Sequence, residues 1–143
     1  MKKSISTIQS DIISEFSMFD DWTEKYEYLI ELGKSVPKIK DDQKKDENLI
    51  KGCQSRVWLF VEKKEDYIIY TADSDAIITK GIIALLIRVF SHQKAEDIAN
   101  SNLHFIDKIG LKEHLSITRA NGMLSMLKQM KMYAIALSKI HNS

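Results

Sequence analysis

Residues 57–72, VWLFVEKKEDYIIYTA, decide the fold of this chain. The stretches VWLFVEK and YIIYTA are rich in β-branched and aromatic residues, and each has the length of a strand. The turn-like Lys64-Glu65-Asp66 separates them, so the sequence predicts a β-hairpin. A short strand at 47–51 could add a third member to the sheet.

Helical patterns lie on both sides of this hairpin. Apolar residues recur at helical spacing from Ile5 to Phe16, and a second helix follows Asp21, which stands at capping-box distance from Glu24. We expect that helix to stop at Gly33 in a left-handed conformation, with Pro37 just beyond it.

After the hairpin, Ala76 to Phe90 carries apolar residues on every face, as is typical of a buried helix. We expect Asp73-Ser74-Asp75 to cap it, and Thr118 to cap a last helix from Arg119 to about Ile140. Short helices are predicted at 94–100 and at 103–109, the latter closed by Gly110. Trp58 and the methionines of the last helix, Met123, Met126 and Met130, are predicted core residues.

Length and composition limit the number of domains and the functions that this chain can have. A chain of 143 residues suits one domain, 1–143, and the element pattern predicts an α+β fold with a small antiparallel sheet and helices packed on it. Twenty-one basic and 20 acidic side chains give a formal charge of +1, which argues against a nucleic-acid partner. The N-terminal MKKSISTIQSD has no apolar core of a signal peptide, and the longest apolar run, 82–87, is too short to span a membrane. We expect a cytoplasmic protein.

The only cysteine, Cys53, is the residue that most needs an explanation. It follows Gly52 and precedes the polar Gln54 and Ser55, which suggests a loop tip between two strands. Thiolate is the reactive form of cysteine, and a nearby cation lowers the thiol pKa. Candidate cations are Lys51, Arg56 and Arg119. The alternative is that Cys53 is a small buried hydrophobe, and the residues alone leave both interpretations open.

The sequence gives little support for a hydrolase, a metal or cluster site, or a nucleotide-binding site. A cysteine hydrolase needs a histidine base, and none of the histidines lies in a recognisable local motif; they are His92, His104, His114 and His141. Metal and cluster sites need more thiolates or closely spaced Cys/His pairs, and no nucleotide-binding or zinc-protease motif occurs. A single thiol can still carry a group, because a thiolate attacks divalent sulfur and can accept a sulfur atom from a persulfide.

Four segments resemble, in order and spacing, the signature blocks of the SufE/CsdE family of sulfur-acceptor proteins. They are LIELGKSVP (29–37), GCQSRVWL (52–59), SDAIITKGIIALL (74–86) and LSITRANGM (115–123), and the similarity extends from about residue 8 to residue 136. One departure is Ile117, where the family often has proline, which concerns how the last helix begins.

The resemblance implies a fold like that of the cluster scaffold IscU, a curved antiparallel sheet with helices on one side, without its metal-ligating cysteines. It implies that Cys53 accepts persulfide sulfur from a pyridoxal-phosphate cysteine desulfurase of the SufS/CsdA type, raises its turnover and passes sulfur to a SufBCD-type scaffold. The pyridoxal phosphate belongs to that partner, so no cofactor or metal is expected here. Arg119 would stabilise the thiolate or persulfide. Supporting positions are Gly52, Gln54, Ser55, Asp73, Ser74 and Asp75.

Two rival functions remain: a binding-only adaptor that activates a desulfurase with Cys53 dispensable, and a stand-alone cysteine hydrolase. The sequence names neither the partner desulfurase nor its docking surface, and it leaves the oligomeric state and the general or specialised route open. We expect Cys53 to be sheltered at rest, because an exposed persulfide would be lost to small thiols.

Overall fold

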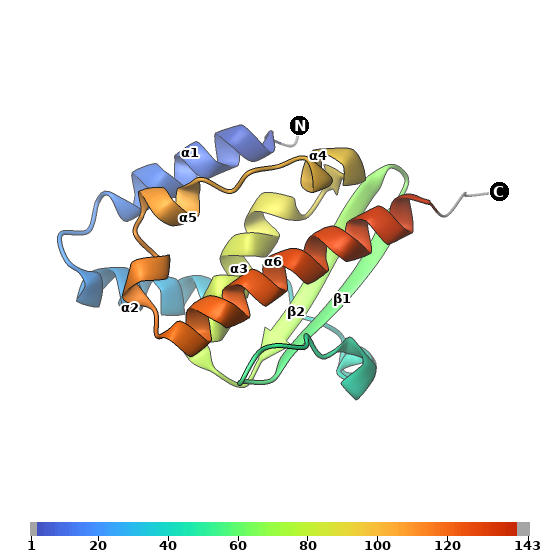
Figure 1. Ribbon diagram of the computed structural model, residues 1–143, viewed down its shortest axis with the longest axis horizontal. Helices are drawn as coiled ribbons and strands as arrows, with labels where there is room; N and C mark the ends of the chain where they lie inside the picture. Colours follow the sequence, from blue (N-terminus) through green and yellow to red (C-terminus); the bar gives the residue numbers. More distant parts are fainter. Residues whose placement is uncertain (1–2, 140–143) are drawn as a thin grey trace.

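The predicted hairpin is the centre of the sheet. In the computed structural model, which describes residues 3–139, β1 (Val57–Lys64) pairs antiparallel with β2 (Tyr67–Ser74) along their full lengths (Figure 1). The backbone turns at Glu65, whose φ of 56° lies in the left-handed region. Leu59, Ile68 and Tyr70 are buried, so one face of the hairpin contributes to the core. The chain thus has the predicted α+β fold.

The third strand is not where the sequence suggested. β3 (Gln93–Lys94) pairs with Tyr67 and Ile68 and gives the order β1-β2-β3. The expected strand at 47–51 is wrong, since η2 (Asp46–Asn48) is a 3-10 turn and Leu49 forms only an isolated bridge to Trp58. The amides of Asn48 and Leu49 bond locally to carbonyls at 45 and 46, and those bonds make them unavailable to β1. A second such turn, η1 (Asp41–Gln43), precedes it.

The two N-terminal helices form as predicted, with one correction. α1 (Ile5–Phe16) is capped by Ser4, and α2 (Trp22–Lys34) is capped by Asp21, whose carboxylate accepts from the Glu24 amide at 2.9 Å. Gly33 does not end α2 in a left-handed conformation, because the helix continues to Lys34 and the φ of Gly33 is not positive. Its role is close packing: a Cβ at Gly33 would lie 2.8 Å from the backbone nitrogen of Gly81.

The buried helix after the hairpin is α3 (Ile77–Phe90), as predicted. The short helices are α4 (Ala95–Ala99) and α5 (Phe105–Lys108). Gly110 follows α5 with a φ of 74°, so here a left-handed glycine does close a helix. A 3-10 turn, η3 (Lys112–His114), leads to the last helix.

The last helix, α6 (Ile117–Ser138), begins earlier than expected. Its N-cap is Ser116, whose hydroxyl accepts from the Arg119 amide at 3.2 Å. The predicted cap Thr118 is therefore wrong, since it already lies within the first turn. The expected end at Ile140 falls outside the described residues.

Helix α6 runs diagonally across the hairpin and α3 (Figure 1). The hydroxyl of the buried Tyr70 on β2 donates to the carbonyl oxygen of Met130 at 2.7 Å, which ties the sheet to α6. The methionines predicted for the core, Met123, Met126 and Met130, are each no more than 1% exposed. Trp58 is only half-buried, with the Lys44 ammonium 4.5 Å from its ring centre. Within residues 3–139 no helix has the length and apolar character needed to cross a membrane.

Candidate functional site

The cysteine loop, residues 51–55, connects two fixed points. Ile50 is buried, and its amide donates to the Val57 carbonyl at 2.9 Å. Between these points Gly52 has a φ of 90°, a conformation that side chains disfavour. A Cβ there would also lie 2.4 Å from the Ser125 hydroxyl oxygen. The loop therefore needs glycine for its backbone and for its close approach to α6.

Side chains of the segment 73–75 fix the backbone of Arg56, where the cysteine loop ends, and do not cap α3. The N-cap of α3 is Ala76, which makes no side-chain cap bond. Instead the Asp75 carboxylate accepts from the Arg56 amide at 3.1 Å, and the Ser74 hydroxyl donates to the Arg56 carbonyl at 2.8 Å. The helix-cap prediction is thus wrong, and these two side chains fix the backbone next to the cysteine loop on both its donor and acceptor sides.

Asp73 forms a buried ionic centre behind the loop. Its side chain is 9% exposed and lies 3.0 Å from the ammonium of Lys44 and 3.1 Å from that of Lys80. Burial alone would raise its pKa, but hydrogen bonds from the two lysines and from the Ser74 amide outweigh burial and lower the pKa below its ordinary value. Asp73 thus joins the loop at 38–48, strand β2 and α3.

Cys53 lies in a small pocket between the cysteine loop, the start of α3 and the start of α6. The pocket has a volume of about 80 Å³ and is lined by Cys53, Gln54, Ser55, Thr79, Ser116, Thr118, Arg119, Gly122 and Met126. A drug-sized ligand needs roughly 300–1,000 Å³, so this pocket suits a few atoms and not a whole substrate molecule. The thiol is half-buried, with its sulfur 3.6 Å from the Gly122 carbonyl oxygen.

The electrostatics of the pocket keep the resting thiol neutral. Burial raises the pKa of Cys53 above its ordinary value. Arg119 lines the same pocket and is exposed, and its backbone amide is used by the Ser116 cap. No ion pair of its guanidinium occurs among residues 3–139. Within residues 3–139, no carboxylate therefore neutralises this guanidinium, and the shift in the pKa of Cys53 has burial as its cause.

The structure brings together most of the residues singled out from the sequence. Cys53, Gln54, Ser55 and Arg119 share the pocket, and Gly52 precedes Cys53 in the loop. Ser74 and Asp75 bond to Arg56 at the end of that loop, whereas Asp73 pairs with Lys44 and Lys80. Sequence reasoning missed the remaining wall residues, which are Thr79, Ser116, Thr118, Gly122 and Met126. Gly122 offered a signal, because a glycine inside a long helix often marks a close approach.

The Cys53 pocket has neither a histidine base for hydrolysis nor a set of metal ligands among the described residues. No histidine of the described chain lines the pocket, and His114 instead stacks on Trp22 with ring centres 4.1 Å apart. His141 lies outside the described residues. Within the described part of the chain, no group of three or more histidine, cysteine or acidic side chains is placed to hold a metal ion. The pocket thus offers a thiol and a cation.

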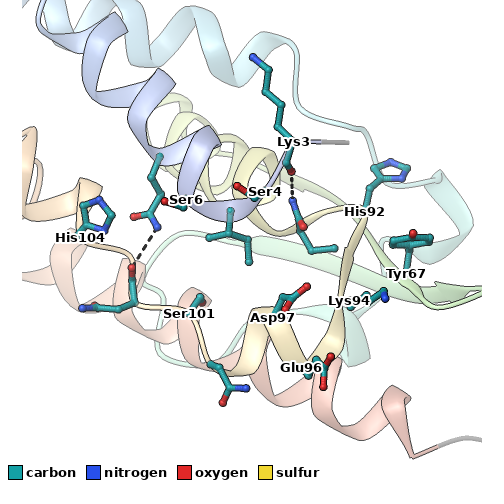
Figure 2. Close-up of a pocket in the computed structure, with 15 residues that line it drawn as sticks. Lys3, Ser4, Ser6, Tyr67, His92, Lys94, Glu96, Asp97, Ser101 and His104 are labelled. Atoms are coloured by element: carbon teal, nitrogen blue, oxygen red, sulfur yellow. Dashed lines mark hydrogen bonds between the residues drawn. The ribbon is translucent and has the colours of Figure 1, made fainter. Parts of the chain in front are cut away.

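A larger pocket of about 830 Å³ lies elsewhere, between the start of α1, β3 and α4 (Figure 2). Its lining is mostly polar. Two hydrogen bonds join its walls, and Figure 2 marks them with dashed lines. The side-chain amide of Gln9 donates to the Asn102 carbonyl at 3.2 Å, and the side-chain amide of Gln93 donates to the Lys3 carbonyl at 2.9 Å. The two pockets share no lining residue, so they are separate sites on the described part of the chain.

Comparison with known proteins gives concordant results. Residues 10–134 match the family described as SufE: Fe-S metabolism associated domain. An uncharacterised SufE-like protein of Rhizobium meliloti strain 1021 is 37% identical over 130 residues, which cover 87% of this chain and 93% of that protein. A second such protein, of Rhizobium etli, is 38% identical over 125 residues, covering 84% of each chain.

A solved structure shares the fold. The solution structure of a hypothetical protein of Thermus thermophilus superposes with a TM-score of 0.75 and covers 91% of this chain and 95% of its own. Its sequence identity is 14%, so this similarity concerns the fold alone.

Proposed function

The chain belongs to the SufE family of domains associated with Fe–S metabolism, and from this premise we propose that it is a sulfur carrier whose acceptor is Cys53. One observation carries the proposal. The only thiol of the chain lies half-buried in a pocket of about 80 Å³ whose wall includes Arg119. A pocket of this size can hold one additional sulfur atom and is far smaller than the pockets that take whole substrate molecules.

The donor is a cysteine desulfurase that carries a persulfide. The Cys53 thiolate attacks the terminal sulfur of that persulfide, so a sulfur–sulfur bond forms on Cys53 as the donor's bond breaks. The donor cysteine leaves as a thiolate and takes up the proton that Cys53 lost. The products are Cys53–S–SH and the free donor thiol, and no external oxidant or reductant is needed. Removal of this sulfur frees the donor for another cycle, so its turnover rises.

Arg119 supports the charged species in this exchange. Burial raises the pKa of Cys53, so the free protein holds less thiolate than an exposed cysteine would, and a nearby cation would favour the reactive form. The exposed guanidinium on the same pocket wall is the cation available to the thiolate, and afterwards to the persulfide. The pyridoxal phosphate belongs to the desulfurase, and the carrier needs no cofactor of its own.

After transfer the sulfur passes to an assembly scaffold of the SufBCD type, in the cytoplasm. The half-buried setting favours this route, because a persulfide in the pocket is less accessible to small thiols in solution. Bonds from Ser74 and Asp75 hold the loop at Arg56, so the loop can present Cys53 without loosening β1.

The test is an intact-mass measurement of the protein after incubation with a SufS-type desulfurase and free cysteine, with and without reductant. We expect one reductant-sensitive sulfur atom on Cys53, and none on the matched Cys53→Ser variant. The variant should bind the desulfurase but fail to raise its turnover. Sulfur-free wild-type protein that still raises turnover, or a Cys53→Ser variant that activates fully, would establish the adaptor function instead.

A further inference from the structure

A third pocket lies between α6 and the part of the chain that runs from the end of α4 to η3 (Figure 1). Its volume is about 420 Å³, within the roughly 300–1,000 Å³ of pockets that hold small organic molecules. It borders the large polar pocket at Ser101 and Asn102 and shares no lining residue with the Cys53 pocket. We call it the α6 pocket.

The apolar part of this lining comes from both walls. Leu103 and Ile106 belong to the wall opposite α6 and are no more than 9% exposed, and Met123 of α6 is fully buried. Leu127 is half-buried, whereas Leu124 is 45% exposed although it also lines the pocket. An apolar group that enters the pocket would remove the exposed surface of Leu124 from water, which favours binding.

The charged part of the lining is mostly positive. It consists of three lysines, Lys112, Lys128 and Lys131, and one carboxylate, Asp107. Lys128 and Lys131 stand at i and i+3 on α6 and therefore lie on the same side of the helix. None of the four side chains forms an ion pair within residues 3–139. Cations thus exceed carboxylates in the α6 pocket, in a chain whose formal charge is only +1.

Lys131 holds part of this positive charge at the pocket wall. Its side chain is half-buried, and its ammonium donates to the carbonyl oxygen of Ser101 at 2.7 Å, which joins α6 to the opposite wall. That bond uses one of the three hydrogens of the ammonium group, so further donors remain for an anion. Lys112 and Lys128 are exposed and have no carboxylate to displace within the described chain.

We propose that the α6 pocket binds a small organic anion with an apolar body, of which a medium-chain monocarboxylate is the simplest example. The lysines receive the carboxylate, and the apolar body covers the leucines. The pocket follows α6 from Met123 to Lys131, roughly 12 Å at a rise of about 1.5 Å per residue, which suits an elongated ligand. An inorganic anion would leave the apolar lining uncovered, and an uncharged apolar molecule would leave the ammonium groups without a partner.

The test titrates the protein with octanoate and, as the matched neutral probe, with octanamide, and follows methyl resonances by NMR. We expect saturable octanoate binding with a Kd of about 5 mM or lower, since a ligand of this size gains at least about 0.3 kcal/mol per non-hydrogen atom. Octanamide has nearly the same shape without the charge, so its Kd should be about fivefold higher or more. The saturating shifts should belong to Leu103, Ile106, Leu124 and Leu127, and the methyl group of Thr79 in the Cys53 pocket should not shift.

A pair of lysine variants tests the charge. Lys112→Gln with Lys128→Gln should raise the Kd for octanoate about fivefold and leave that for octanamide within about twofold, because only the anion uses the charge. The control is Lys38→Gln with Lys45→Gln, which changes the net charge equally at exposed positions outside the pocket. It should leave both Kd values within about twofold.

A leucine variant tests the apolar contact. Leu124→Ser should raise the Kd for both probes by about threefold or more, because both lose the same apolar surface. Met132→Ser, at an exposed position of α6 outside the pocket, should leave both values within about twofold. Both variants should unfold at nearly the same urea concentration as the wild type, since both side chains are exposed.

Equal affinity of the wild type for the two probes, or equal loss in both lysine variants, would overturn the assignment of an anion. Absence of saturable binding, or unchanged binding in Leu124→Ser, would overturn the pocket itself. The proposal does not rest on sulfur transfer, so Cys53→Ser should bind octanoate with the wild-type Kd. A loss of binding in Cys53→Ser would place the ligand in the Cys53 pocket and also overturn the proposal.

Discussion

The sulfur of Cys53 lies 3.6 Å from the carbonyl oxygen of Gly122, in the first turns of α6. The contact is made to the backbone, and position 122 has no side chain on that side of the thiol. A Cβ there would lie 3.5 Å from the same sulfur, which is an ordinary van der Waals distance. The glycine thus leaves open the side of the thiol on which another atom can be added.

A Gly122→Ala variant should separate stability from sulfur acceptance. Alanine in a helix interior is favoured over glycine by about 0.5–1 kcal/mol, so the free energy of unfolding in urea should rise or stay level. The added methyl takes space beside the sulfur, so persulfide should accumulate on Cys53 more slowly with a desulfurase and cysteine. The exposed neighbour Asn121→Ala, which does not line the pocket, serves as the control. Unchanged transfer in Gly122→Ala would contradict the argument.

The same substitution at Gly81 should have the opposite effect on stability. A Cβ at Gly81 would lie 2.2 Å from the carbonyl oxygen of Leu29, and backbone cannot move aside as a flexible side chain can. The clash should outweigh the gain in helix propensity and lower the free energy of unfolding by about 1–3 kcal/mol or more. Urea unfolding monitored by circular dichroism measures this, and a Gly81→Ala variant as stable as the wild type would show that α2 and α3 can separate at no cost.

These two glycines illustrate what the sequence could and could not predict. The elements themselves followed from local patterns, because runs of β-branched and aromatic residues, helical periodicity and caps such as Asp21 are readable within a few residues. The third strand at Gln93–Lys94 was missed because two residues carry no periodicity. Gly33 was interpreted as a helix end, since its contact with Gly81 depends on tertiary packing.

At the Cys53 site, too, some features could be predicted from the sequence and others could not. Cys53 and Arg119 were identified from the sequence, and the structure places both on one pocket wall. The local pattern assigned Ser74 and Asp75 to a cap of the following helix, because their partner Arg56 is distant in sequence. Only the family resemblance implied a supporting role at the cysteine loop. The raised pKa of the thiol was also beyond the sequence, since it depends on how much of the side chain is buried.

The pH dependence of the free thiol tests this burial. The rate of alkylation by a small reagent should have its midpoint above about 8.5, the ordinary pKa of cysteine, while the urea-unfolded chain reacts with the ordinary midpoint. Because the folded pKa is the higher one, folding stability from this group is complete below the unfolded pKa and is lost as pH rises through the folded value. The Cys53→Ser variant should lack that loss. A folded midpoint below that of the unfolded chain would contradict the assignment.

Arg119 gives a sharper version of that experiment. Burial is the cause of the raised pKa at rest, so Arg119→Ala should leave the alkylation midpoint of the free protein nearly unchanged. The variant should nevertheless accept sulfur more slowly at saturating desulfurase, and Arg119→Lys should recover part of the rate because it restores the charge. If Arg119→Ala instead shifts the resting midpoint, the arginine acts on the free thiol and not on the charged species formed in transfer.

Asp73 predicts a second pH dependence, of opposite sign and at acidic pH. Its carboxylate bonds to Lys44 and Lys80, and these bonds lower its pKa below the ordinary value. The contribution of Asp73 to folding stability is therefore present above the unfolded pKa of about 3.9. It is lost as the pH falls through the lower pKa of the folded state. Asp73→Asn should lower the free energy of unfolding at pH 7 by about 1–3 kcal/mol, the cost of losing charged hydrogen bonds at a buried site.

The difference between wild type and Asp73→Asn should then shrink as the pH is lowered below about 4, because the wild-type carboxyl also becomes neutral. Urea unfolding at a series of pH values measures it. Asp11 provides the control, since its pair with Lys3 is on the surface and Asp11→Asn should change stability by less than about 1 kcal/mol at any pH. A difference at Asp73 that stays constant down to about pH 2 would mean that the asparagine disturbs packing, because a lost charge cannot act where both side chains are neutral.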